Sequence, residues 1–457
     1  MSSLLICATP VHGHVTPLLA VSRFLVGQGH HVRFLTGARY RGAVEATGAT
    51  YLPLPLEADY DDRDMDAAFP GRVGRSGASG IRYDMSTIFI APVPAQVRAV
   101  DQALAAEPTD AVLVESMFFG AAALLSRSRT ARPPVITLGI IPLGLASTDT
   151  APFGLGIPPV PGLAGRVRNA ALRVVAEKIV FGPVQRDAEQ AVREATGCEL
   201  PGFFMDYGRL ADALVQFTVP GFEYPRPDLP SSVRFVGPVS RTTPSDTPVP
   251  SWWGDLDGTR PVVHVTQGTV ANRDYDQLIT PTITALAEED VLVVVSTGGR
   301  DVTTLPPLPA NVRAAEYLPY DALLPLTDVY VSNGGYGGVH FALEHGVPLV
   351  VAGATEDKVE VTARVAWSGA GLNLRTHQPT PAAVRTAVRT VLADHRYRRA
   401  AARLGSEITA SPGLAGLEAA LGDVLHARAT TPGIPAGRRR QARAATAPEP
   451  ADRRRGR

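Results

Sequence analysis

The chain has 457 residues and a mass of 48.3 kDa, a length that suits two or three domains. Apolar residues make up 45% and charged residues 19%, which supplies hydrophobic cores and excludes a chain dominated by disorder. No apolar run approaches the ~18 residues of a membrane span. The start lacks the positive charges of a secretory signal, and two cysteines cannot form a disulfide framework. We therefore expect a cytoplasmic protein that binds no membrane.

The formal net charge is zero, but the charges are unevenly distributed. Residues 427–457 contain nine arginines against Glu449 and Asp452, so the rest of the chain has a surplus of seven negative charges. A mildly acidic body argues against nucleic-acid binding. Because the segment 427–457 is rich in Pro, Ala and Arg and lacks apolar periodicity, we expect it to be a disordered basic tail.

Residues 1–218 alternate between strand and helix patterns. The apolar run 4–8 reads as a strand, 15–26 has apolar residues at helical spacing, and 31–35 is strand-like again. Further strands are expected at 111–114 and 135–138. Repeated strand–helix–strand units form parallel sheets, so this part is predicted to be one α/β domain.

A proline-rich stretch at 219–261 reads as a linker, and a second α/β domain is expected at 262–410, followed by a closing helix at 411–426. The strands predicted in the second domain are 262–266, 291–296, 312–315, 329–332 and 349–352. The predicted fold class is therefore α/β, with two doubly wound, Rossmann-like domains facing each other across a cleft. Ligands of such folds bind beyond the carboxyl ends of the strands.

A glycine-rich segment follows the predicted strand 329–332 and precedes a helix. Its four glycines lie within five positions: Gly334, Gly335, Gly337 and Gly338. Glycines let the backbone approach a phosphate closely, and a helix N-terminus offers unpaired N–H groups and a positive dipole end. Thr269 follows another strand and could add a hydroxyl donor. The alternative is a tight turn without a ligand, and the spacing matches neither GxGxxG nor a P-loop.

Two titratable residues follow strands of the first domain. His14 comes after the first strand, and Glu115 comes after the strand at 111–114. Histidine titrates near neutral pH and suits general-base chemistry. A carboxylate beside it could fix the tautomer of the imidazole and stabilise its charged form. The alternatives are a polar turn residue and a solvated acid.

Taken together, the His14 turn, the glycine-rich loop, Gly346-Val347-Pro348 and Glu356-Asp357-Lys358 resemble the GT-B glycosyltransferases. More narrowly, they resemble the UDP-glycosyltransferase superfamily (family GT1) in its actinobacterial natural-product branch. The resemblance covers the chain except for its tail. It implies that His14 deprotonates an acceptor and that an acid orients it; Glu115 stands where the family usually has Asp.

The resemblance also implies a nucleotide-sugar site in the second domain. The expected donor-binding residues are Thr269, Tyr317, Asn333, Gly335, Gly337, Gly338, Asp357 and Lys358. Asn333 replaces a histidine that touches the diphosphate, and Lys358 replaces the glutamine that partners Asp357 on sugar hydroxyls. Tyr317 replaces a base-stacking tryptophan. Phe341 takes the place of a ribose-binding glutamate, which points towards a deoxyribose nucleotide such as dTDP.

The acceptor implied by the resemblance is apolar and often aromatic. Candidates for lining its pocket are Met85, Phe118, Phe119 and Ile141, each of which suits a core position equally well. Residues 57–92 read as an irregular, acidic loop that could close over an acceptor.

Asp-x-Asp pairs raise the question of a metal. The pairs between Asp59 and Asp66 read as a solvated loop, Asp255 and Asp257 lie in the linker, and Asp274 and Asp276 read as a helix start. A helix dipole can take the charge of the leaving group without a metal. We therefore expect no metal site and no cofactor besides the nucleotide-sugar co-substrate, linked to UDP or dTDP.

The predicted function is an inverting, metal-independent hexosyl transfer from a UDP- or dTDP-sugar to a hydrophobic natural-product acceptor. The expected partners are that donor and that small-molecule acceptor, and no nucleic acid. Two alternatives stay open: a nucleotide-sugar epimerase of GT-B fold, and a non-catalytic nucleotide-sugar-binding protein.

Overall fold

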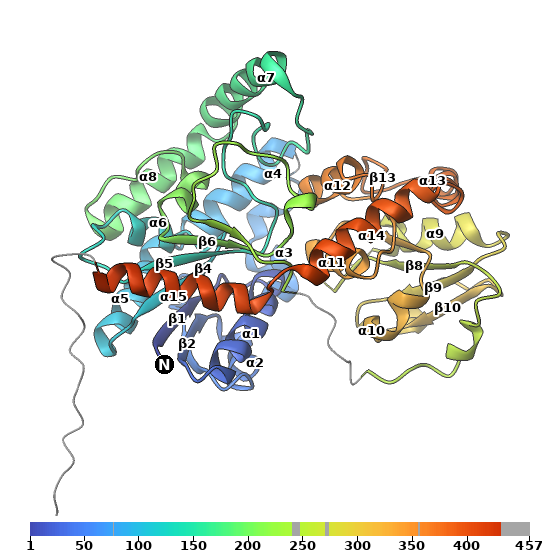
Figure 1. Ribbon diagram of the computed structural model, residues 1–457, viewed down its shortest axis with the longest axis horizontal. Coiled ribbons are helices and arrows are strands. Elements are labelled where there is room, and N and C mark those ends of the chain that lie inside the picture. The colour runs from blue at the N-terminus through green and yellow to red at the C-terminus, as the bar shows by residue number, and fades with distance from the viewer. Residues whose placement is uncertain (76, 240–246, 270–273, 355–356, 431–457) are drawn as a thin grey trace, which may run out of the picture.

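Two parallel β-sheets form the frame of the molecule, and helices cover both faces of each sheet (Figure 1). The structure is a computed structural model that describes residues 1–75, 77–239, 247–269, 274–354 and 357–430. The predicted fold class, α/β with two doubly wound halves, is confirmed.

The first sheet has seven parallel strands in the order β3-β2-β1-β4-β5-β6-β7. Its strands are β1 (Ser3–Cys7), β2 (His31–Thr36), β3 (Thr50–Pro53), β4 (Ala111–Glu115), β5 (Val135–Gly139), β6 (Ala213–Gln216) and β7 (Val233–Phe235). The central strands are apolar without alternation because both of their faces are covered; Leu4, Leu5 and Ile6 are fully buried. The winding direction reverses between β1 and β4, which is where ligands bind in open α/β sheets.

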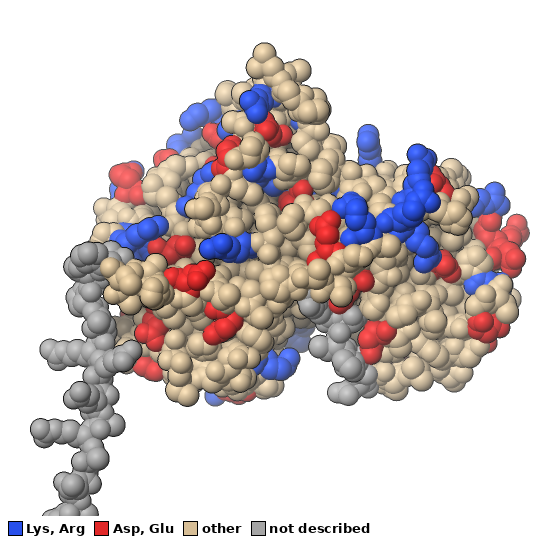
Figure 2. Space-filling model, viewed as in Figure 1, with Lys and Arg blue, Asp and Glu red and all other residues tan. Residues whose placement is uncertain are grey.

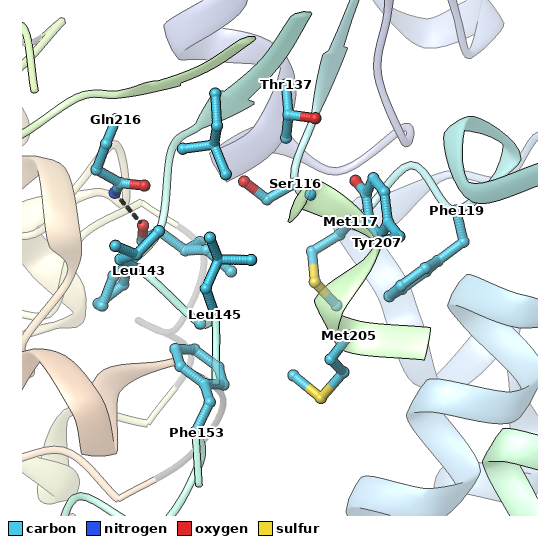
Figure 3. A pocket seen from close by; sticks show the side chains of 15 residues that line it. Ser116, Met117, Phe119, Thr137, Leu143, Leu145, Phe153, Met205, Tyr207 and Gln216 are labelled. Atoms are coloured by element: carbon cyan, nitrogen blue, oxygen red, sulfur yellow. Dashed lines mark hydrogen bonds between the residues drawn. The ribbon is translucent and has the colours of Figure 1, made fainter. Parts of the chain in front are cut away.

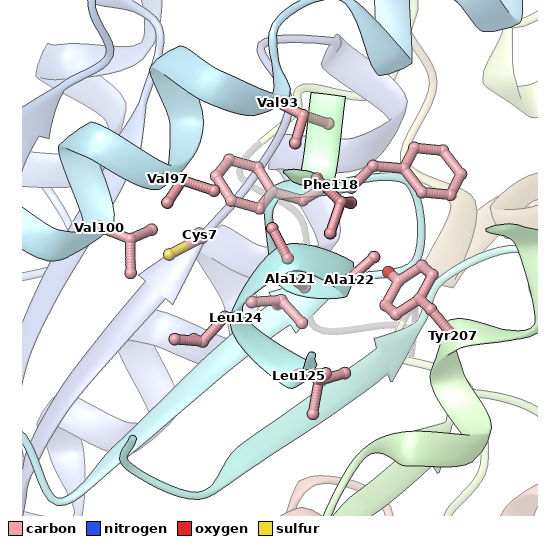
Figure 4. Packing of buried hydrophobic residues seen from close by; sticks show 14 of the residues in the cluster. Cys7, Val93, Val97, Val100, Phe118, Ala121, Ala122, Leu124, Leu125 and Tyr207 are labelled. Carbon is pink, nitrogen blue, oxygen red and sulfur yellow. The ribbon is translucent and has the colours of Figure 1, made fainter. Parts of the chain in front are cut away.

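Two hydrophobic cores cover the faces of this sheet. One face packs against α5 (Val93–Ala106), α6 (Gly120–Leu125) and α8 (Gly182–Thr196). Figure 4 shows part of this core, in which Cys7 of β1 meets side chains of α5 and α6. The other face packs against α1 (His12–Gly27) and α15 (Leu414–Thr430). Shorter or more peripheral helices are α2 (Arg41–Glu45), α3 (Met65–Ala68), α4 (Gly77–Asp84) and α7 (Gly162–Val174).

The second sheet has six parallel strands in the order β10-β9-β8-β11-β12-β13. Its strands are β8 (Val262–Thr266), β9 (Leu292–Ser296), β10 (Val312–Ala315), β11 (Val329–Ser332), β12 (Leu349–Val351) and β13 (Gly371–Asn373). One face packs against α9 (Ile279–Leu286) and α13 (Pro381–Ala393). The other packs against α11 (Tyr336–Glu344), α12 (Lys358–Trp367) and α14 (His395–Ala410), while α10 (Tyr320–Leu323) follows β10.

The boundary between the halves differs from the prediction. Residues 219–261 were expected to be a linker, but they contain β7, which pairs with β6 through Leu214 and Val233. The first sheet therefore extends into that segment. A strand of three residues has too little pattern to be recognised among prolines.

The C-terminal helix also differs from the expected closing helix at 411–426. Helix α15 begins at Leu414 and ends at Thr430, so the first four residues of the predicted tail 427–457 are helical. The chain crosses back to the first half, where Leu417 and Leu421 are buried in the core beside β6 (Figure 1). Residues 431–457 lie outside the part of the chain that the structure describes.

The segment 57–92, expected to be an irregular loop, is largely helical. It contains α3, α4, two short 3-10 turns and a π-helical turn at Met85–Ile90. Local periodicity did not reveal these elements, since each spans only three to eight residues.

Polar contacts join the two halves close to the carboxyl end of β6. The Gln216 Nε2 donates to the Tyr336 hydroxyl at 3.2 Å, and the Thr218 hydroxyl lies 2.7 Å from His340 Nε2. Both contacts reach α11, the helix that follows the glycine-rich loop. The end of the first sheet therefore lies directly against that loop's helix.

The charged side chains are mostly paired. In the view of Figure 2, Lys and Arg side chains gather near α14, while both signs are mixed over the first half. Arg396, Arg398 and Arg403 of α14 each contact a carboxylate, at 2.7, 2.8 and 2.9 Å. These three arginines therefore each have a carboxylate partner. Across the described ranges, no helix has the length and apolar character needed to cross a membrane.

Truncation of one α15 side chain tests the docking of this helix. Leu417 is fully buried, so we expect Leu417→Ala to lower the free energy of unfolding by about 2–5 kcal/mol. Asp423→Ala on the same helix removes only an exposed ion pair with Arg234 and should change it by less than about 1 kcal/mol. Urea unfolding of both variants is the measurement, and equal losses would contradict this packing.

Candidate active site

The parallel pairing of two neighbouring strands brings His14 and Glu115 together. Cys7 at the end of β1 lies opposite Val114 of β4, so the residues that follow these positions meet at one edge of the sheet. His14 lies in the first turn of α1, and Glu115 is the last residue of β4. The His14 Nδ1 lies 3.1 Å from Glu115 Oε2.

The Glu115 carboxylate is fully buried and held by several donors. Besides His14, the backbone N–H of Met117 donates to it at 2.6 Å and that of Thr9 at 3.2 Å. Burial alone would raise the pKa of Glu115, but the positive imidazolium of His14 and these hydrogen bonds together hold it below its ordinary value. The longer side chain of glutamate therefore reaches His14 from the position where the family usually has aspartate.

The geometry suits a general base. A neutral imidazole that donates from Nδ1 to a carboxylate has its lone pair on Nε2. The His14 side chain is 14% exposed, whereas Glu115 is 0% exposed, so the carboxylate orients the ring from inside. On the ring's flank lies Phe89, stacked at 6.1 Å between centroids. Phe89 belongs to the π-helical turn, and sequence reasoning did not single it out.

Asp62 anchors the turn that contains His14. Its Oδ2 accepts from the backbone N–H of His12 at 2.6 Å, and its Oδ1 accepts from the Tyr40 hydroxyl at 2.8 Å and from Arg39. Asp62 is only 4% exposed. The prediction that this aspartate belongs to a solvated loop is therefore wrong, because its carboxylate satisfies the first backbone N–H of α1.

A narrow apolar pocket lies beside the end of β4 (Figure 3). Ser116 and Met117, directly after Glu115, line it together with Phe119, Met205 and Tyr207 on one side, and Leu143, Leu145 and Phe153 on the other. Its volume is about 50 Å³, well below the roughly 300 Å³ at the lower end of drug-sized ligand sites. A bulky ligand therefore requires its walls to move apart.

The predicted acceptor-binding residues divide into two pairs. Phe119 and Ile141 line the pocket. Phe118 is fully buried among the side chains of the first core (Figure 4), and Met85 belongs to the same core. The expectation that Phe118 and Met85 contact an acceptor therefore has no support from the structure. Phe118 and Phe119 are neighbours in sequence just after β4 and point to different sides, and only Phe119 lines the pocket.

The glycine-rich loop connects β11 to α11, and its glycines differ in how closely neighbouring residues pack against them. Gly334 has φ +84°, and a Cβ there would lie 2.6 Å from Thr362; a Cβ on Gly338 would lie 2.9 Å from the Tyr330 hydroxyl. By contrast, the nearest atom of the described residues to a Cβ on Gly335 is Asn333 Oδ1, at 3.8 Å. Packing among the described residues therefore explains Gly334 and Gly338 but not Gly335.

The other predicted donor residues follow strands of the second sheet at their carboxyl ends. Asn333 donates from Nδ2 to the Gln267 carbonyl at 2.7 Å, which ties the loop to the end of β8. Thr269 is exposed two residues further on. Tyr317 is 56% exposed and its ring lies over Gly299, a position open to a stacking partner. Asp357 and Lys358 begin α12, and the Lys358 side chain is buried.

Phe341, in α11, lies with its ring edge-on to Tyr320 at 5.9 Å between centroids. Glu356 lies outside the described residues. Within the described ranges, no group of three or more His, Cys, Asp or Glu side chains is arranged to hold a metal ion.

Comparison with known proteins defines the class of the molecule. Residues 280–421 match the family model described as "Erythromycin biosynthesis protein CIII-like, C-terminal domain". Crystal structures of the glycosyltransferase of kitacinnamycin and of the calicheamicin glycosyltransferase CalG4 superpose with TM-scores of 0.66 and 0.65, at 21% and 23% identity. Each covers 92% of this chain, and 97% and 98% of their own chains are matched. The fold is GT-B.

Relatives in sequence define the family. The 4'-demethylrebeccamycin synthase of Lentzea aerocolonigenes is 45% identical over 410 residues, which are 89% of this chain and 95% of the relative. The UDP-glycosyltransferase 2 of Phaeomoniella chlamydospora is 37% identical over 429 residues, 90% of this chain and 93% of the relative. The chain belongs to the UDP-glycosyltransferase superfamily (family GT1), in its actinobacterial natural-product branch, and is a glycosyltransferase of natural-product biosynthesis.

Replacement of Glu115 tests the buried carboxylate. Its folded pKa lies below the ordinary value of 4.5, so the carboxylate stabilises the fold above that pH and this contribution is lost as pH falls through the folded pKa. We expect Glu115→Gln to cost about 1–3 kcal/mol near neutral pH, and the wild-type and variant melting curves to converge in acid. Thermal unfolding of both proteins from neutral pH down into acid measures this difference in stability. A difference in Tm that did not narrow in acid would contradict the assignment.

Proposed function

We propose that the enzyme transfers a hexose with inversion, without a metal, from a UDP- or dTDP-sugar to a hydrophobic small-molecule acceptor. The observation that supports this most is the His14–Glu115 hydrogen bond at the carboxyl ends of β1 and β4, together with the glycine-rich loop at the N-terminus of α11 in the other half. A base and an anion site on opposite sides of a reacting carbon are what an inverting displacement needs.

In the first step, the acceptor hydroxyl or N–H lies against His14 Nε2. The imidazole takes the proton while the acceptor atom forms a bond to the anomeric carbon. Glu115, already ionised, stabilises the imidazolium that results. Because the attacking atom approaches from the face opposite the departing group, the anomeric configuration inverts.

In the same step, the bond between the anomeric carbon and the diphosphate oxygen breaks. The electron pair leaves with the nucleoside diphosphate, whose charge the backbone N–H groups at Gly335, Gly337 and Gly338 and the dipole of α11 would receive. Thr269 and the second N–H of Asn333 could add donors. Asp357 and Lys358 would hold sugar hydroxyls at the start of α12. This arrangement supplies the stabilisation without a cation.

The choice of acceptor rests on the pocket and on one relative. The residues around the pocket are mainly apolar and aromatic, and the relative with 45% identity is named for rebeccamycin. Both support a hydrophobic secondary metabolite. The presence of Phe341 at the position of the ribose-binding carboxylate supports a deoxyribose donor, while the names of other relatives support UDP.

Removal of the imidazole tests the base. We expect His14→Ala to lower kcat by about 10²–10⁴-fold and to leave the Kd of the nucleotide within about twofold, because the nucleotide would bind to the other half. His12→Ala, on the same turn but outside the dyad, is the matched control. Its kcat should fall by less than tenfold, a loss on the order of one hydrogen bond. Full turnover by His14→Ala would refute the base assignment.

A thermal-shift panel with UDP, dTDP, NAD and ATP in the presence of EDTA tests the donor site. A ligand at about 100 times its Kd adds roughly 2.7 kcal/mol of stability, which is a shift of several degrees. We expect UDP or dTDP to raise Tm without metal. Stabilisation by NAD alone, or stabilisation that appears only when Mg²⁺ replaces EDTA, would contradict the proposal.

A further inference from the structure

A buried network of charged residues connects the two halves. It consists of Glu223, Glu360 and Arg364, whose side chains are at most 5% exposed. Arg364 and Glu360 lie one turn apart on α12 of the second half, and Glu223 lies between β6 and β7 of the first half. None of these residues belongs to the dyad or to the glycine-rich loop.

Glu360 holds one end of a loop of the first half. Its Oε1 accepts from the backbone N–H of Gly154 at 2.8 Å and of Gly156 at 2.9 Å, across 206 and 204 residues of chain. A Cβ on Gly156 would lie 2.8 Å from the carbonyl of Val359, so the loop lies directly on α12. Charge-assisted bonds of this kind are about twice as strong as neutral ones.

Arg364 and Glu223 hold the other end of the same loop. Arg364 donates from Nη1 to Glu360 at 2.6 Å and from Nε to Glu223 at 2.9 Å, and its guanidinium stacks on the Tyr224 ring at 4.3 Å. Glu223 Oε1 in turn accepts from the backbone N–H of Leu143 at 2.8 Å. Arg226 donates to the Leu143 carbonyl at 2.6 Å.

The loop held at these two ends, residues 141–156, forms one wall of the pocket. Leu143, Leu145 and Phe153 face Met117 and Tyr207 across it (Figure 3). Since this pocket is too small for a bulky acceptor in its present shape, the position of the loop decides what enters.

The opposite side of α12 contacts the donor site. Thr362 lies against Gly334 of the glycine-rich loop, and Asp357 and Lys358 begin the helix. One short helix therefore touches the glycine-rich loop and, through Glu360 and Arg364, the pocket wall.

We propose that Glu360 and Arg364 are positioning residues that transmit donor binding to the acceptor pocket by holding the loop 141–156 on α12. This inference rests on the proposed function. A nucleotide bound against α12 restrains the helix, and the helix in turn restrains both ends of the loop. The pocket wall therefore takes its acceptor-binding position only when the donor is present.

Hydrogen–deuterium exchange tests this without knowledge of the acceptor. With dTDP or UDP added, we expect exchange to slow in the glycine-rich loop and also in residues 141–156 of the wild type, by at least about fivefold in each. If the nucleotides protect the glycine-rich loop but leave 141–156 unchanged, the coupling is refuted while the donor site stands. If neither nucleotide protects the glycine-rich loop, the proposed function and the coupling both fail.

Substitutions of Glu360 separate coupling from simple stability. Glu360→Ala removes the acceptor for Gly154 and Gly156 and should abolish the nucleotide response of 141–156, while protection of the glycine-rich loop persists. Glu360→Gln keeps a carbonyl oxygen for these N–H groups but loses the charge opposite Arg364, so its response should be intermediate. Retention of the full wild-type response by both variants would overturn the proposal.

Glu289→Gln is the matched control. Glu289 pairs with Arg385 and Arg389 within the second half, at 3.3 and 2.8 Å, and has no contact with the loop. Because the partners of Glu289 are more exposed than Arg364, this variant should lose less stability than Glu360→Gln, and it should keep the wild-type response of 141–156. If Glu360→Ala fails to fold, Glu360→Gln is compared with Glu289→Gln instead. An equal nucleotide response of 141–156 in these two variants would refute the role of Glu360.

Discussion

The hydrogen bond between His14 and a carboxylate with no exposure to solvent is the interaction on which the proposed chemistry depends. It exists because β1 and β4 are parallel neighbours at the point where the winding of the first sheet reverses. A buried carboxylate stays ionised only when donors surround it. Two backbone N–H groups and the imidazole supply them, and Asp62 fixes the turn from the other side.

In the proposed mechanism, the second half contributes an anion site rather than reactive side chains. Two of the loop's glycines are required by contacts within the protein, whereas no described residue packs closely against Gly335. Whether a glycine has close packing contacts separates a tight turn from a ligand site better than the number of glycines does. The buried contacts of α12 connect this half to the pocket of the other half. Glu360 and Gly154, which form one of these contacts, are 206 positions apart.

Much of the fold and part of the site could be predicted from the sequence. The strands expected near β1, β4, β8 and β11 are present, since each is an apolar run buried on both faces. His14 and Glu115 were identified because they follow such strands, and parallel sheets gather strand ends at one edge. Strands as short as β7 and β13 and the small helices of 57–92 were missed because their patterns span too few residues.

What the sequence by itself determined is therefore the local part of the molecule: the βαβ periodicity, the glycine-rich turn before α11, and which polar residues follow strands. Only the tertiary structure decided which of Phe118 and Phe119 faces the pocket, that Asp62 is buried, that Phe89 flanks His14, and that Glu360 binds Gly154 and Gly156. The physical reason is that periodicity reports the environment of neighbouring residues. Side chains that meet across hundreds of positions are brought together by the packing of whole sheets and helices, which no local pattern encodes.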